Sequence, residues 1–158
     1  MQWLRQKKAE DPSVFWRAVE ERRGGPVTFS SFAQLLGRSG GGTLALAGLL
    51  YLVNDIAWFE DFPKDNWIAR MLDGNAEYEK TEISFALSEV AAVRFVRRGG
   101  ALQCVGGGTD PEKVPEASRL AQFFAVPIVE VLFHNRSAVF FDLLRRREFE
   151  ALFAARKT

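Results

Sequence analysis

A long apolar run that reverses direction once is the feature of this sequence that most limits its fold. Residues 48–59 are apolar or aromatic except for Asn54 and Asp55 near the middle. A pair of this kind between two apolar segments is typical of a two-residue β-hairpin turn, in which both central residues adopt positive φ. The longest mainly apolar stretch, residues 43–53, is shorter than the ~20 residues of a membrane-spanning helix. The sequence therefore predicts two antiparallel strands joined at Asn54 and Asp55.

The segments that follow continue the period of two that is typical of strands. Ile83, Phe85 and Leu87 alternate with polar or small residues, which predicts a strand with one buried face. Further strands are expected around Val93 and Phe95, over 102–104 after a turn at 97–100, and over 128–133 and 138–141 on either side of a turn. Residues 147–156 place Phe149, Leu152 and Phe153 on one helical face. This order predicts a small antiparallel barrel or sandwich closed by a C-terminal helix.

Helical patterns precede and interrupt these strands. Asp11 and Pro12 are typical of a helix start, and Gly24 of a helix end. Phe29, Phe32, Leu35 and Leu36 repeat the helical spacing and predict a second helix. We therefore expect two units, a helical extension over 1–40 and a domain over 43–156. Within that domain, helices are expected over 64–74 and 110–124.

Several of the predicted elements resemble parts of a known family. Leu50-Tyr51-Leu52-Val53-Asn54 followed by Ile56-Ala57-Trp58-Phe59 resembles the opening hairpin of GRAM and bacterial PH-like domains, and residues 83–90 are similar to a later strand. Residues 138–141 and 147–152 are similar to the final strand and capping helix of that family. The resemblance implies an α+β, mainly β, PH-like fold, with two nearly orthogonal antiparallel sheets, a C-terminal capping helix and here an added N-terminal helical segment. Val53 stands where the family usually has Thr.

The charge distribution argues against nucleic acid as a partner. The net charge is +1, with 21 basic and 20 acidic residues, whereas DNA binding requires a concentrated basic face. Residues 54–82 are acidic, and they include Glu60, Asp61, Asp65 and Asp73. We interpret these four as a solvated acidic loop, because their spacing does not match a calcium-binding loop.

Residues suited to catalysis are few, so the sequence argues against an enzyme. His134 is the single histidine and falls in a predicted turn, and Cys104 is the single cysteine and falls in a predicted strand. We expect a surface histidine and a buried thiol, since a general base or a nucleophile would need a positioned partner. No cofactor, metal site or catalytic residue is therefore predicted.

Two groups of residues are candidates for binding. Arginine bonds two phosphate oxygens at once, so a first group is the candidate site for anionic lipid headgroups: Arg94, Arg97, Arg98, Arg145, Arg146 and Arg147. A second group has helical spacing and is the candidate site for a protein partner, although core packing is the alternative: Trp67, Ile68, Met71 and Leu72.

Two functional hypotheses result, neither of them enzymatic. The first is a cytoplasmic interaction module that acts through protein–protein contacts, including self-association. The alternative is a peripheral membrane module, which would bind anionic lipid at the inner face of the membrane through the basic residues.

Overall fold

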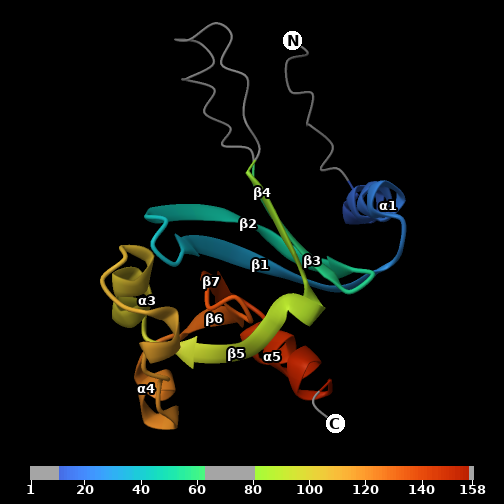
Figure 1. Ribbon diagram of the computed structural model, residues 1–158. Coiled ribbons are helices and arrows are strands. Elements are labelled where there is room, and N and C mark those ends of the chain that lie inside the picture. Colours follow the sequence, from blue (N-terminus) through green and yellow to red (C-terminus); the bar gives the residue numbers. More distant parts are fainter. Residues whose placement is uncertain (1–10, 63–80, 157–158) are drawn as a thin grey trace, which may run out of the picture.

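The computed structural model describes residues 11–62 and 81–156 (Figure 1). Its strands are β1 (Val27–Arg38), β2 (Thr43–Val53), β3 (Ile56–Asp61), β4 (Glu82–Ala86), β5 (Val90–Val96), β6 (Ile128–Phe133) and β7 (Ala138–Leu143). All pairings are antiparallel, and they join the strands into one sheet with the order β4-β3-β2-β1-β7-β6-β5. The sheet is curled, so it has a concave and a convex face (Figure 1).

The hairpin predicted at residues 48–59 is confirmed. β2 and β3 pair from Gly48 with Asp61 to Val53 with Ile56. Asn54 and Asp55 form the turn with φ of 51° and 61°, which two-residue turns between twisted strands require. The hairpin formed by β6 and β7 is confirmed in the same way, with residues 134–137 between the strands.

The second predicted helix is wrong, because residues 27–38 form strand β1 at the centre of the sheet. β1 pairs with β2 on one side and with β7 on the other. Phe29 and Leu35 face the concave core, Leu36 is buried on the convex face, and Phe32 is exposed. A strand that is covered on both faces over part of its length loses its period of two, which explains the helical appearance of the sequence. The boundary predicted between residues 40 and 43 falls in the turn between β1 and β2.

Four α-helices are spread around the sheet in the described part of the chain: α1 (Pro12–Arg23), α3 (Arg98–Val105), α4 (Arg119–Phe124) and α5 (Arg146–Ala154). Single 3-10 turns, η1 (Leu87–Glu89) and η2 (Pro111–Lys113), lie between them. Asp11 caps α1 by accepting a hydrogen bond from the Ser13 backbone N–H at 3.0 Å, and Gly24 ends it with φ of 79°, so this helix is confirmed.

Two other predictions between residues 97 and 124 are wrong in part. Residues 98–105 form α3 instead of a turn and a strand. The buried residues of this segment have helical spacing and pack against the convex face: Ala101, Cys104 and Val105. Their burial stabilises a helix here, although Gly99 and Gly100 are typical of a turn. The helix predicted over 110–124 is limited to 119–124, because a proline at 115 interrupts the backbone hydrogen bonds of a helix.

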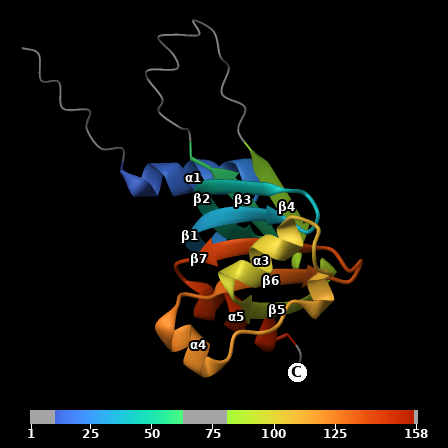
Figure 2. The same ribbon diagram turned by 90° about the vertical axis from the view of Figure 1, so that its left-hand side faces the viewer.

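Three apolar clusters hold the sheet and helices together. The largest lies on the concave face, where Phe149 and Phe153 of α5 pack against the strands. A second lies beneath α3 on the convex face and includes Leu36 and Phe140; Figure 2 shows α3 across β6 and β7. The third lies beneath α1 and includes Tyr51. Both faces of the sheet are therefore partly covered.

The predicted PH-like fold class is wrong. The strands form a single curled seven-stranded sheet, a half-barrel with β4 and β5 at its two ends, instead of two orthogonal sheets. The helices lie on both faces of this sheet instead of forming a C-terminal cap. The period of two indicated strands correctly, but periodicity alone does not determine how strands are ordered into sheets.

Candidate functional site

An exposed apolar surface surrounds α4, and we call it the α4 surface. It consists of four side chains with high exposed fractions: Leu120 (68%), Phe123 (83%), Phe124 (78%) and Val126 (58%). The rings of Phe123 and Phe124 contact each other edge to face at 5.4 Å. Exposed apolar side chains gathered in this way mark a site of contact with another protein or with a membrane.

Local hydrogen bonds hold α4 in a position that projects from the sheet. The Ser118 hydroxyl accepts from the Ala121 backbone N–H at 3.1 Å and caps the helix. The Ala117 backbone N–H donates to the carbonyl of Phe95 at 2.7 Å, which ties the start of α4 to the edge strand β5. Both views show α4 standing apart from the sheet (Figures 1 and 2). The exposed side chains therefore belong to an anchored helix that projects from the fold.

A groove of about 760 Å³ separates α4 from the sheet. Leu120 and Phe124 line it on the helix side, whereas Arg97, Arg98 and Asp142 line it on the other. Arg98 donates to the Asp142 carboxylate at 3.0 Å. Phe123 is not among the lining residues, so apolar side chains project from more than one side of α4.

The six arginines predicted to bind an anion lie at different places in the structure. Arg97 and Arg98 line the groove beside the α4 surface. The Arg94 side chain is instead committed to the fold, because it pairs with the buried Glu130 and donates to the carbonyl of Pro111 at 2.9 Å.

The other three arginines of that group lie at the start of α5. Arg145 pairs with Glu148 and donates to the carbonyl of Ser30 at 2.8 Å. Arg147 is exposed and Arg146 is half-buried. The groove lining thus includes only Arg97 and Arg98 from the predicted group. The predicted protein-binding residues Trp67, Ile68, Met71 and Leu72 lie outside the described residues.

Sequence reasoning missed Phe123 and used the apolar spacing of this segment only to predict a helix. The helical spacing of Leu120 and Phe124 was a correct signal for a helix, but the sequence alone does not show whether anything covers it. The adjacent Phe123 and Phe124 were the available signal for exposure, because successive helix positions lie about 100° apart and cannot share one buried face.

The acidic loop is also different from the prediction in the part that the structure describes. Glu60 and Asp61 are buried instead of solvated. Arg22 and Arg23 donate to Glu60 at 2.6 and 2.8 Å, and Asp61 accepts from the Thr81 backbone N–H at 2.8 Å. Their charges therefore serve internal contacts and do not form an exposed acidic surface.

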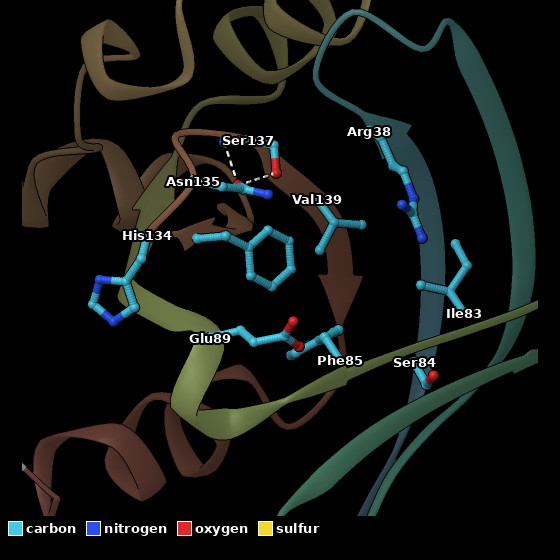
Figure 3. Close-up of a pocket in the computed structure, with 10 residues that line it drawn as sticks. Arg38, Ile83, Ser84, Phe85, Glu89, His134, Asn135, Ser137 and Val139 are labelled. Atoms are coloured by element: carbon cyan, nitrogen blue, oxygen red, sulfur yellow. Dashed lines mark hydrogen bonds between the residues drawn. The ribbon is translucent and has the colours of Figure 1, made fainter.

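A second hollow lies at one side of the curled sheet, and we call it the edge cavity. It has a volume of about 310 Å³ and lies between β4, the end of β1 and the turn between β6 and β7 (Figure 3). Arg38, Glu89 and Asn135 line it together with apolar side chains. Sequence reasoning did not identify this cavity, since its lining comes from three segments far apart in the chain.

Of the two residues considered for catalysis, Cys104 is buried and His134 is exposed. Cys104 is buried as predicted, although in a helix, and burial followed by the nearby charges of Glu130 and Asp110 raises the pKa of its thiol to about 11. His134 is exposed as predicted. Within residues 11–62 and 81–156, no three His, Cys, Asp or Glu side chains are placed to hold a metal ion together. No helix in these ranges has the length and apolar composition needed to span a bilayer.

Comparisons with known proteins give a fold but no family. No protein-family model matches the chain, and no curated protein matches it in sequence. Among solved structures, the chain is similar to the C-terminal domain of an unknown protein from Leishmania infantum, with a TM-score of 0.50 and 13% sequence identity over 90% of this chain and 94% of that one. At this identity the likeness concerns the fold alone, and the GRAM resemblance stays an untested prediction.

Proposed function

We propose that the protein is a peripheral membrane module, which binds an anionic bilayer through the α4 surface. The observation that carries this proposal is the exposure of Leu120, Phe123, Phe124 and Val126 beside a groove lined by Arg97 and Arg98. Apolar side chains can enter the acyl region while arginines meet the headgroups. This proposal favours the membrane hypothesis over the protein–protein hypothesis.

Charge supports an anionic surface as the occupant. Residues 117–127 contain one charged side chain, the exposed Arg119, and no acid. Within the described residues, the Arg97 side chain makes no ion pair, so its charge is available. Asp142 at the groove is already paired with Arg98. Because Glu60 and Asp61 are buried, they do not add to an acidic surface that would repel such a membrane.

The shape of the α4 surface also favours a bilayer over a protein partner. Phe123 lies outside the groove that Phe124 lines, so the exposed side chains point in several directions. A fluid hydrocarbon phase can surround such a projection on all sides. A protein partner would instead need a concave pocket that encloses the projecting helix α4.

The two contributions to binding differ in size. Transferring a fully exposed Leu, Val or Phe side chain out of water contributes about 1.5–3 kcal/mol, whereas each arginine near an anionic surface contributes ~1 kcal/mol. Four apolar side chains therefore outweigh Arg97 and Arg119 together. We expect the loss of Phe123 and Phe124 to weaken membrane binding more than the loss of these two arginines.

The test is co-sedimentation with vesicles of phosphatidylcholine alone and of phosphatidylcholine mixed with phosphatidylglycerol. We expect binding to the mixed vesicles, strong loss in the variant Phe123→Ala/Phe124→Ala, and smaller loss in Arg97→Gln/Arg119→Gln. Matched controls are Val14→Ala/Phe15→Ala, two exposed apolar residues on α1, and Arg17→Gln/Arg136→Gln, two exposed arginines elsewhere. Circular dichroism checks that each variant is folded.

Three outcomes would overturn the proposal. The first is equal binding of the α4 variants and their controls, and the second is no binding to the mixed vesicles. The third is a dimer, seen by size-exclusion chromatography with light scattering, that dissociates in Phe123→Ala/Phe124→Ala. That result would assign the α4 surface to self-association.

A further inference from the structure

The edge cavity combines an apolar floor with a polar rim. Ile83 and Phe85 of β4, Phe133 of β6 and Val139 of β7 are its apolar lining. Ile83, Phe85 and Val139 are buried and belong to the concave core, so the cavity is an extension of that core towards solvent. Its volume of about 310 Å³ lies at the lower end of the roughly 300–1,000 Å³ range of ligand pockets. A small apolar body therefore fits it.

Arg38 supplies an unused positive charge at the rim. It is the last residue of β1, and its side chain is exposed. That side chain makes no hydrogen bond or ion pair with any other described residue. Figure 3 shows its guanidinium on the side of the cavity, opposite Asn135. A guanidinium can bond both oxygens of a carboxylate, which gives position as well as attraction.

Asn135 supplies a second donor whose direction is fixed. Its Oδ1 accepts from the backbone N–H of Ser137 at 2.9 Å and from the Ser137 hydroxyl at 2.6 Å. A backbone N–H can only donate, so the side-chain oxygen must face Ser137. The amide nitrogen then faces the cavity (Figure 3), where it can donate to a ligand oxygen.

Glu89 limits the negative charge that the cavity accepts. Its carboxylate accepts from the Ala86 backbone N–H at 2.7 Å, which holds it at the rim. A second negative charge on a ligand would be repelled by this carboxylate, because like charges repel each other. The rim thus suits one negative charge and disfavours two.

We propose that the edge cavity binds a small molecule with an apolar body and a single carboxylate, such as a medium-chain fatty acid. The apolar body lies on Phe85, Phe133 and Val139, and the carboxylate accepts hydrogen bonds from Arg38 and the Asn135 amide. This site is separate from the α4 surface and does not depend on the proposed membrane binding.

The test uses three probes of equal chain length: octanoate, 1-octanol and the dicarboxylate suberate. His134 lines the cavity and is the single histidine of the chain, so the NMR signal of its ring reports on the site without a labelling scheme. We expect a saturable shift of this signal with octanoate. Octanol lacks the charge-assisted hydrogen bonds and should bind about tenfold more weakly, and suberate should also bind more weakly than octanoate.

Variants locate the carboxylate. Arg38→Gln should lower the affinity for octanoate to that for octanol, whereas Arg38→Lys should retain part of the difference. Arg136→Gln is the matched control, because Arg136 is exposed in the turn between β6 and β7, beside Asn135, but does not line the cavity. The variant Phe123→Ala/Phe124→Ala should bind octanoate as the natural chain does, which separates this site from the α4 surface.

Three results would overturn the proposal. The first is equal affinity for octanoate and octanol, which would leave only apolar binding. The second is an unchanged octanoate affinity in Arg38→Gln. The third is octanoate binding by calorimetry without any shift of the His134 signal, which would place the ligand elsewhere.

Discussion

The Tyr51 hydroxyl donates to the Glu60 carboxylate at 2.7 Å, and this pair lies beneath the C-terminal end of α1. Arg23 donates to both, to the Tyr51 hydroxyl at 3.1 Å and to Glu60 at 2.8 Å, and its guanidinium lies 3.5 Å from the ring centre of Trp58. Burial raises the pKa of the Tyr51 hydroxyl, so it remains the donor at neutral pH. One carboxylate thus joins α1 to the hairpin of β2 and β3.

We expect the change Glu60→Ala to lower the free energy of unfolding by about 2–4 kcal/mol, because it leaves the Arg23 charge and the Tyr51 hydroxyl without their buried partner. Glu82 also pairs with Arg23, at 2.9 Å, but its side chain is 40% exposed against 4% for Glu60. The matched change Glu82→Ala should therefore cost less than about 1 kcal/mol. Urea denaturation measures both, and equal effects would contradict a buried role for Glu60.

Two glycines should respond in opposite directions to alanine. A Cβ on Gly48 would lie 2.1 Å from the Glu60 carbonyl oxygen and 2.8 Å from the Asp61 Cα, both of which belong to the backbone of the paired strand β3. Gly48→Ala should therefore lower the free energy of unfolding by about 2–3 kcal/mol.

Gly99 lies in α3, and a Cβ there would have no neighbour within 4 Å. Gly99→Ala should raise the free energy of unfolding by about 0.5–1 kcal/mol, since alanine favours the helix. Thermal unfolding of the two variants beside the natural chain measures both effects. A Gly99→Ala variant that is less stable than the natural chain would contradict this prediction, because it would show that the helix does not tolerate a side chain at position 99.

Glu130 should make stability depend on pH. It is fully buried, its Oε2 accepts from Arg94 Nε at 2.7 Å, and its Oε1 has no hydrogen-bond partner among the described residues. Burial raises the pKa of this carboxyl above its ordinary value of 4.5, although Arg94 opposes the shift. The folded state therefore binds the proton more tightly than the unfolded state does.

The contribution of Glu130 to the free energy of unfolding is fully present below its pKa in the unfolded state. This contribution is lost as the pH rises through its pKa in the folded state. The change Glu130→Gln removes the titration. We expect the natural chain to lose stability relative to Glu130→Gln as the pH is raised from about 4 towards neutral, measured by urea denaturation at several pH values. The raised pKa of Glu130 would be contradicted if the two stabilities changed in parallel with pH. It would also be contradicted if the natural chain became more stable relative to Glu130→Gln as the pH is raised.

Local patterns in the sequence predicted those elements whose chemistry is decided nearby. Asn54 and Asp55 set the turn of the hairpin, and Asp11 and Gly24 set the ends of α1. Phe149 and Phe153 were expected on one face of a final helix, and both are buried in the concave core. In each case neighbouring residues supply the interactions that determine the conformation.

Elements that depend on distant parts of the chain were not predictable in this way. β1 has the spacing of a helix because α3 covers only part of its convex face, so that Leu36 is buried there and Phe32 is exposed. The edge cavity brings Arg38 together with Glu89 and Asn135, a proximity that only the curled sheet creates. The candidate basic residues Arg97 and Arg98 were identified from sequence, but the exposure of Phe123 beside them was not.

The central place of β1 has a consequence for the order in which this chain becomes available to fold on the ribosome. Ala33 pairs with Gly48, only 15 positions later, but on its other side with Leu143, 110 positions later. During synthesis the first four strands can assemble early, while β1 keeps an open edge of unpaired backbone groups until residues 138–143 emerge. An open edge of this kind pairs readily with other chains, so a nascent or prematurely terminated polypeptide lacking β7 would aggregate through β1.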